Sequence, residues 1–241
     1  MVIPIGDEPS GLRTPPYVVY GLIAINVLVW LLQLQLGESF TNGWSTVPYE
    51  ITHGQDLIGT RTVVAGGESF PVRLYAGPTP IYLTLLSAMF MHGSWLHILG
   101  NMLYLWIFGD QIEYLLGRGR FIVFYLLCGL AASLAQILYS PEAVVPSLGA
   151  SGAIAGVLGA YMVKFPRNRV RVLVGRGLTT MPALMVLGLW ILLQFFAQVG
   201  SPAGEATGVA YMAHIGGFVA GIALVLLMTA GRRVSTVRVS S

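Results

Sequence analysis

Six apolar segments, each close to the length needed to cross a bilayer, set the strongest limit on how this chain folds. They comprise residues 16–36, 95–113, 121–139, 147–163, 180–199 and 208–229. A helix of about 20 apolar residues spans the hydrocarbon core of a membrane. Of all 241 residues, 55% are hydrophobic and 10% are charged, whereas a typical soluble domain has about 25% charged residues. The pattern predicts an all-α polytopic membrane protein with six transmembrane helices, forming one membrane domain over residues 16–229.

A long polar insert, residues 37–80, separates the first two apolar segments and is predicted to be a long first extracytoplasmic loop. Within it, residues 62–64 and 70–75 flank Gly66-Gly67, which predicts a β-hairpin with a glycine turn. The apolar residues 81–91 are too few to span a bilayer, so we expect them to lie at the interface or to extend the second helix. Residues 1–15 and the basic tail 230–241 are expected to be cytoplasmic.

The distribution of lysine and arginine gives the expected orientation. With the N-terminus inside, 11 of the 13 basic residues lie in inner segments, and only Arg61 and Arg73 lie outside. The inner basic residues are Arg13, Arg118, Arg120, Lys164, Arg167, Arg169, Arg171, Arg176, Arg232, Arg233 and Arg238. Because cytoplasmic loops are enriched in Lys and Arg, both termini are predicted to be cytoplasmic, in a multi-pass protein of a prokaryotic plasma membrane. This orientation accounts for the net charge of +3 without a nucleic-acid partner.

A serine and a histidine mark the candidate site. Ser151 follows Gly149 and Ala150 at the start of the fourth apolar segment, and His214 lies near the start of the sixth. The predicted topology places both residues in the outer half of the membrane, together with His97 and Asn101 of the second segment. A serine beside a histidine base is the minimum equipment for nucleophilic catalysis. Polar groups from three distant segments therefore fall in one layer.

The fourth helix is predicted to be short. If it begins near Ser151 and ends before Pro166, its roughly 15 residues extend only ~22 Å, less than the ~30 Å hydrocarbon core. Its N-terminus would then lie below the outer surface, where its amide groups favour developing negative charge. Small residues on the fourth and sixth segments allow close helix packing. They are Gly152, Gly156, Gly159, Gly217 and Gly221.

The expected chemistry is acyl transfer, with Ser151 as nucleophile and His214 as base. His97 and Asn101 are four residues apart, hence on one helix face, and both can donate hydrogen bonds to an oxyanion. The alternative is that ordinary packing and helix–helix hydrogen bonding explain all four residues. Intramembrane histidines are rare enough to favour function. His92 is interpreted as a structural hydrogen-bonding residue.

Other kinds of site fit the sequence less well. The histidines occur without a His-Glu-x-x-His sequence and Cys128 is the single cysteine, so we expect no metal and no cofactor. Asp110 and Glu113 lie at the inner end, which argues against a carboxylate-dyad protease; we expect them to cap the second helix or to pair with Arg118 and Arg120. A small-solute transporter is disfavoured because the outer apolar layer contains no acidic residue for ion coupling.

Four stretches resemble the rhomboid intramembrane serine proteases. Residues 91–102 (MHGSWLHILGNM) resemble the family's second-helix motif, and residues 108–113 (FGDQIE) with Gly117 resemble its Glu-x-x-x-Gly element. Residues 149–152 (GASG) resemble the nucleophile motif, and residues 213–217 (AHIGG) with Gly221 resemble the final-helix motif. The similarity covers roughly residues 81–228, in the same order.

The resemblance implies a Ser-His dyad, Ser151 and His214, that cleaves transmembrane segments of other proteins near the extracytoplasmic face. It implies an oxyanion hole of His97, Asn101 and the Ser151 amide. His92, Glu113, Gly149, Gly152 and Gly217 would be structural. The fifth helix and the loop 200–207 would gate substrate entry.

One position departs from the family pattern. Ala155 stands where many relatives carry an aromatic ring beside the catalytic histidine, so Tyr211 or Tyr161 is expected to hold His214 instead. A non-catalytic rhomboid-like protein that binds or retains membrane clients is the alternative function. The sequence sets neither the substrate nor the oligomeric state.

Overall fold

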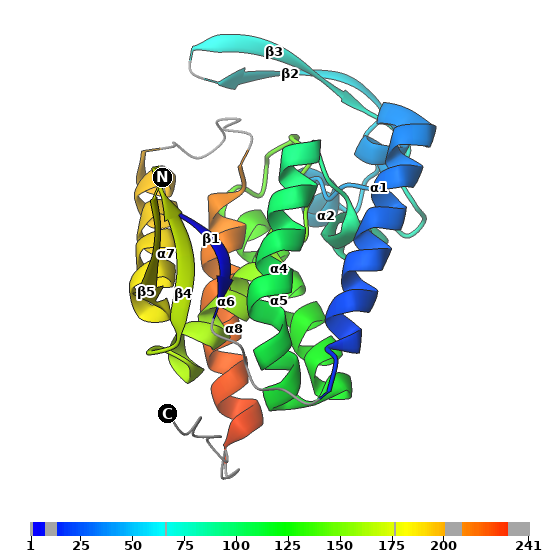
Figure 1. Ribbon diagram of the computed structural model, residues 1–241. Helices are drawn as coiled ribbons and strands as arrows, with labels where there is room; N and C mark the ends of the chain where they lie inside the picture. The colour runs from blue at the N-terminus through cyan, green and yellow to red at the C-terminus, as the bar shows by residue number, and fades with distance from the viewer. Residues whose placement is uncertain (1, 8–13, 66, 176, 201–208, 231–241) are drawn as a thin grey trace, which may run out of the picture.

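Six helices of the computed structural model coincide with the six apolar segments (Figure 1). They are α1 (Tyr17–Gly43), α4 (Trp95–Leu116), α5 (Arg118–Tyr139), α6 (Ser151–Lys164), α7 (Ala183–Val199) and α8 (Tyr211–Thr229). The structure describes residues 2–7, 14–65, 67–175, 177–200 and 209–230. The predicted C-terminal tail, the start of the sixth segment at 208 and the gate residues 201–207 lie outside these ranges.

Three of the described helices, α1, α5 and α8, are long and apolar enough to cross a membrane. α6, with 14 residues, and α7, with 17, are apolar but shorter. The short fourth helix is therefore confirmed, since α6 begins at Ser151 and ends at Lys164, before Pro166. The chain is an integral membrane protein with a mostly helical fold.

α6 lies at the centre of the bundle. Every residue from Gly152 to Tyr161 is buried, and α6 packs on α5 and α8. The helices α6 and α8 meet backbone to backbone: a Cβ on Gly217 would collide with the Gly152 carbonyl, and one on Gly221 with the Gly156 backbone. The expected role of these small residues in close packing is confirmed.

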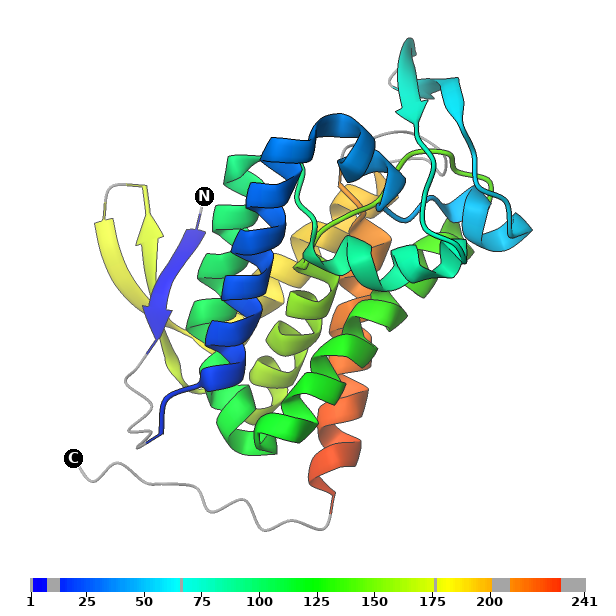
Figure 2. The ribbon, with the colours of Figure 1, turned by 90° about the vertical axis from the view of Figure 1, so that its right-hand side faces the viewer.

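The polar insert contains α2 (Pro48–His53) and a hairpin of β2 (Gly59–Ala65) and β3 (Glu68–Leu74). The predicted hairpin is thus confirmed, although residue 66 of its turn is not described. The first helix extends past the predicted end at residue 36, because the chain breaks helical geometry only at Gly37 (φ 78°) and then resumes to Gly43. Figure 2 shows the hairpin projecting from one end of the bundle.

Residues 81–91 do not extend the second helix. They form three short helical turns, η1 (Ile81–Leu83), α3 (Thr84–Ser87) and η2 (Ala88–Phe90). α4 begins afterwards at Trp95, where the Ser94 hydroxyl accepts the His97 N–H and caps the helix. This cap fixes the first turn of α4, on which His97 lies.

The all-α prediction missed a three-stranded antiparallel sheet, in the order β1 (Val2–Asp7), β4 (Arg169–Val174), β5 (Gly177–Pro182). The fifth segment consequently starts as strand at Thr180, and α7 begins only at Ala183. Alternation in residues 169–172 explains β4, because the two arginines are exposed and the two valines are buried. Figures 1 and 2 show the sheet on one side of the bundle, along α4 and α7.

The sheet is fastened to the bundle through Asp7. Its carboxylate accepts hydrogen bonds from the Tyr161 hydroxyl (2.7 Å) and the Gln111 amide (2.8 Å). Asn168 donates to both of these partners, to the Gln111 oxygen at 3.1 Å and to the Tyr161 oxygen at 3.2 Å. Tyr161, expected as a possible support for His214, is therefore engaged elsewhere.

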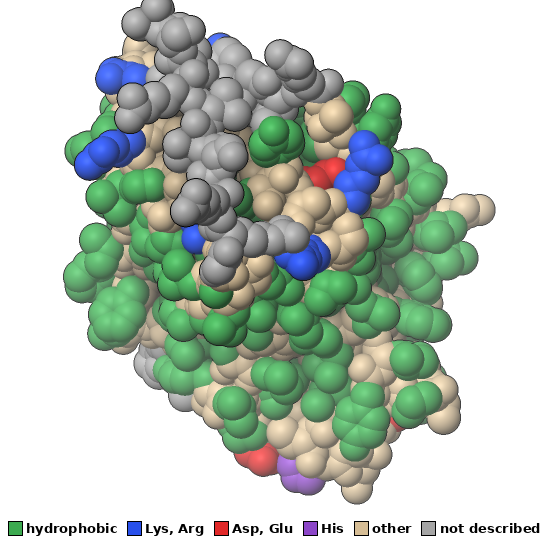
Figure 3. All heavy atoms as spheres, turned by 90° about the horizontal axis from the view of Figure 1, so that it is seen from below, with side chains coloured by type: hydrophobic (Ala, Val, Ile, Leu, Met, Phe, Trp, Pro, Cys, Tyr) green, Lys and Arg blue, Asp and Glu red, His purple; other side chains and the backbone are tan. Residues whose placement is uncertain are grey.

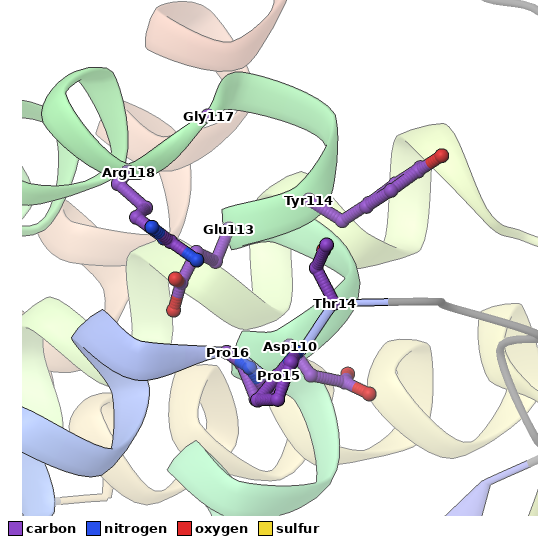
Figure 4. Close-up of a pocket in the computed structure, with 8 residues that line it drawn as sticks. All are labelled: Thr14, Pro15, Pro16, Asp110, Glu113, Tyr114, Gly117 and Arg118. Atoms are coloured by element: carbon purple, nitrogen blue, oxygen red, sulfur yellow. The ribbon is translucent and has the colours of Figure 1, made fainter.

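Glu113 caps the first helix rather than the second. Its carboxylate accepts the backbone N–H groups of Val18 (3.1 Å) and Val19 (2.8 Å), at the start of α1. The Arg118 guanidinium lies over the Tyr17 ring at 4.6 Å. Figure 4 shows Glu113 and Arg118 in the hollow of about 270 Å³ at this end of the molecule. For Glu113, the expected capping of the second helix, or pairing with Arg118 and Arg120, was wrong because tertiary packing brings α1 to this carboxylate.

This same end carries basic side chains. Figure 3 looks onto it and shows Lys and Arg around the face, with hydrophobic side chains over the flanks. Arg118 and Arg120 begin α5, and Lys164 ends α6. An apolar belt with a basic end is the surface expected of a protein in a bilayer.

Candidate active site

Ser151 is the first residue of α6, presented by a loop that only glycine allows. Gly149 has φ 132°, and its N–H donates to the Ala88 carbonyl (2.8 Å). A Cβ at this position would lie 2.8 Å from Cε1 of His97 and 3.5 Å from the Ser151 hydroxyl. The Gly149 backbone therefore lies directly beside both side chains, and any larger residue would push them away.

His214 lies in the first turn of α8, opposite Ser151. Its Nε2 is 2.8 Å from the Ser151 Oγ. Its Nδ1 is 2.7 Å from the Oε1 of Gln194, on α7. The Trp190 ring lies near the imidazole, with centroids 5.8 Å apart and planes inclined by 37°. A hydroxyl, an imidazole and an amide thus form one hydrogen-bonded chain across α6, α8 and α7.

The histidine and asparagine of α4 lie on the same cavity as Ser151. Asn101 Nδ2 is 2.9 Å from Nε2 of His92, which is fully buried. The His92 backbone is held in turn by Gln33 of α1, which donates to its carbonyl and accepts its N–H, both at 2.9 Å. His97 Nδ1 is 3.4 Å from the Gly93 N–H. His92 therefore supports the position of Asn101 from behind.

The cavity that joins these groups has a volume of about 740 Å³. α4 forms one wall, with His97 and Asn101, and α7 forms another, with Trp190 and Gln194. Ser151 and His214 also line it. A volume of this size lies within the range of cavities that bind small ligands.

Two glutamines near the site were not found from the sequence. Gln194 bonds to His214, and Gln33 bonds to the His92 backbone. Both interrupt apolar segments, and a carboxamide in a membrane helix is costly unless it is paired. This cost was the feature of the sequence that could have pointed to both glutamines. Ala155 is fully buried. Gln194 and Trp190 lie beside the imidazole, whereas Tyr161 bonds to Asp7 and Tyr211 lines the same cavity.

The fold and the site together define a class: an integral membrane protein whose bundle holds a serine and a histidine in hydrogen-bonding contact. Comparison with known proteins agrees with this class. A protein-family profile described as the Rhomboid domain matches residues 80–231. The chain belongs to the rhomboid family.

Relatives come from mitochondria and bacteria. Rhomboid protein 1, mitochondrial, of Saccharomyces cerevisiae is 33% identical over 151 residues, which make up 58% of this chain and 40% of that protein. Rhomboid protease GluP of Bacillus subtilis is 32% identical over 154 residues, covering 64% and 26% respectively. Presenilin-associated rhomboid-like protein A, mitochondrial, of Danio rerio is 31% identical over 142 residues, covering 55% and 37%. Each alignment covers less than half of the relative's length.

Proposed function

We propose that this protein is an intramembrane serine endopeptidase that cleaves transmembrane segments of other membrane proteins near the extracytoplasmic face. The observation that carries the proposal is the 2.8 Å contact between Ser151 Oγ and His214 Nε2 at a cavity inside the bundle. All six long helices act as spans, with α6 reaching only part of the way, and the residues that lead into α1, Thr14 to Pro16, lie on the cytoplasmic side with Arg118. The basic end in Figure 3 is then the cytoplasmic end of a protein in a prokaryotic plasma membrane.

In the proposed reaction, Ser151 Oγ attacks the scissile carbonyl carbon while His214 Nε2 takes its proton. The carbonyl oxygen becomes an oxyanion, stabilised by His97, the Asn101 amide and the free N–H groups at the start of α6. The imidazolium then gives its proton to the departing amine, and an acyl-enzyme ester remains on Ser151. Water, deprotonated by His214, hydrolyses this ester and restores the serine.

The remaining site residues hold this arrangement in place. His92 and Gly149 position Asn101 and Ser151, and the pair Gly152 and Gly217 allows α8 to approach α6 closely enough for the hydrogen bond. The substrate enters past α7. The resemblance to rhomboid proteases favours substrates with a small residue before the cleaved bond and helix-weakening residues after it. The enzyme and its substrate are both embedded in the lipid bilayer, where they bind each other.

The test is cleavage of a model transmembrane substrate by the protein reconstituted in liposomes. Ser151→Ala and His214→Ala are expected to lower the cleavage rate by at least about 10³-fold. Cys128→Ala, which changes a buried thiol that plays no part in the reaction, serves as the control. A fluorophosphonate probe should label the wild type at Ser151. Equal cleavage by wild type and Ser151→Ala would refute the proposal and favour a rhomboid-like protein that only binds its clients.

A further inference from the structure

Gln194 is a polar side chain that α7 directs into the cavity. Its neighbours in sequence, Leu193 and Phe195, are 57% and 52% exposed on the outer face of the helix. Trp190, one turn earlier, lines the cavity with Gln194. A leucine at position 194 would be cheaper to place in a membrane helix than a carboxamide. The hydrogen bond between Gln194 and His214 therefore accounts for the presence of a carboxamide at this position.

That bond determines which ring nitrogen of His214 carries the proton. A carboxamide oxygen only accepts hydrogen bonds. Since Oε1 of Gln194 lies 2.7 Å from Nδ1, the proton of the neutral imidazole belongs on Nδ1. Nε2 is then left with a free lone pair, 2.8 Å from the Ser151 hydroxyl. A neutral imidazole in the other tautomer would donate from Nε2 to Ser151 and could not accept the serine proton.

We propose that Gln194 is a positioning residue that holds His214 in the tautomer and orientation needed to deprotonate Ser151. This inference rests on the proposed protease function and adds a third member to the Ser-His pair. Gln194 touches neither Ser151 nor the reacting carbonyl in this arrangement; it acts through the imidazole. Its oxygen also stabilises the imidazolium that forms during the reaction, because the Nδ1 proton stays hydrogen-bonded throughout.

The surroundings of His214 leave this role to Gln194. From α6, Ser151 bonds to Nε2, and Ala155 provides only a methyl group. From α7, Trp190 contacts the ring without offering an acceptor, since its indole nitrogen only donates. Among the described residues, the oxygen of Gln194 is the acceptor that the structure places at Nδ1.

The kinetic test compares three variants of the full-length protein in liposomes. Gln194→Met keeps the length of the side chain but removes the acceptor, so kcat is expected to fall by about tenfold to a hundredfold with KM nearly unchanged. Gln194→Glu keeps an oxygen acceptor and should retain most of kcat. Leu193→Met alters the neighbouring residue, which is 57% exposed and does not line the cavity, and should cleave like the wild type.

A spectroscopic test reads the tautomer directly, and its first measurement, on the wild type, needs no variant at position 194. The protein has four histidines, and with ¹⁵N-labelled histidine the signals of His214 are identified by their loss in His214→Ala. The wild type should show a protonated Nδ1 and an unprotonated Nε2. Gln194→Met should show a mixture of tautomers, and Gln194→Glu should restore the wild-type pattern.

The outcomes separate this inference from the proposed function. If the wild type cleaves, Ser151→Ala does not, and Gln194→Met cleaves as fast as the wild type, the positioning role is overturned while the protease remains. A wild-type spectrum with the proton on Nε2 also overturns it. If wild type and Ser151→Ala cleave equally, the protease proposal itself fails.

Discussion

Two of the helices that contact α8 near the active site, α6 and α7, do so in opposite ways. α6 meets α8 through backbone atoms, with Gly152 against Gly217 and Gly156 against Gly221. α7 meets it through side chains: its buried residues, Ala183, Val186 and Leu187, all lie in its first turns. Beyond them, Trp190 and Gln194 make the contact with His214.

The difference separates a rigid part of the site from a part that can yield. The backbone contact between α6 and α8 fixes the distance between nucleophile and base, because no side chain between them can adjust. Near the site, the contact between α7 and α8 is made by the side chains of Trp190 and Gln194, which can rotate. This supports α7 as the helix that gives way to a substrate. Opening α7 would also break the Gln194 bond, so the base would be fully positioned only when α7 returns.

Among changes that test this comparison, the largest effect is expected from widening the contact between α6 and α8. In Gly221→Val, the new side chain collides with the Gly156 backbone and forces α8 away from α6. A displacement of about 1 Å can cost about a hundredfold in rate, and overpacking costs about 1–3 kcal/mol in stability. Cleavage assays and thermal unfolding in detergent measure both losses.

The matched change on α7 is Gly188→Val, because a Cβ at Gly188 meets nothing within 4 Å. This variant should have the same unfolding temperature and the same cleavage rate as the wild type. Equal losses in the two variants would show that α6 and α7 do not differ in the way described.

A smaller effect is expected from Gly149→Ala, which alters the loop beside Ser151 without touching the α6–α8 contact. The methyl group meets the His97 ring at 2.8 Å, and φ of 132° is strained for alanine. We expect kcat to fall about tenfold or more, with a smaller loss of thermal stability than in Gly221→Val. Gly37→Ala is the control, since Gly37 has φ 78° and a Cβ there meets nothing within 4 Å; it should lose stability but keep kcat.

Trp190→Leu should loosen α7 selectively. Removing an aromatic contact costs about 1 kcal/mol, which corresponds to about a fivefold change in local opening. Hydrogen–deuterium exchange should therefore accelerate in the outer half of α7 and stay unchanged in α6. Faster exchange in both helices would contradict the distinction between them.

The smallest effect is a dependence of the stability of the polar insert on pH. The insert packs on the loop that leads into α6. Thr46 pairs with Ser147, and the Tyr49 N–H bonds to Ala143, in the loop before Ser151. Burial, with a smaller contribution from Asp56, raises the pKa of Glu50 from 4.5 to about 7.

The folded insert thus binds this proton more tightly than the unfolded chain does. The contribution of this bound proton to the stability of the fold is fully present below about pH 4.5 and is lost as the pH rises through about 7. Hydrogen exchange in α2 should therefore be slower at about pH 5 than at about pH 8, after correction for the intrinsic rate. Glu50→Gln, which imitates the protonated form, should remove the difference, and exchange in α7 should not respond. An unchanged pH dependence in Glu50→Gln would assign the effect to another group.

Local patterns made the helices predictable. Each apolar segment became a helix because backbone groups in an apolar surrounding must bond within their own segment. The hairpin of the insert was predictable because alternating residues flank a glycine turn. The pairing of β1 with β4 was not predictable, because the paired residues are separated by more than 160 residues in sequence, as in the pair Ile3 and Leu173. The alternation of Arg and Val in β4 hinted at a strand but not at its partner.

By itself, the sequence determined a membrane bundle and the candidate pair Ser151 and His214, because hydropathy and glycine-flanked polar residues are local properties of the chain. The tertiary structure alone decided what surrounds that pair. It brought Gln194 rather than Tyr161 to the imidazole, and it turned Glu113 into the cap of a helix more than 90 residues earlier. Hydrogen bonds act over about 3 Å, so partners far apart in sequence become known only when the packing of the helices sets the distances between them.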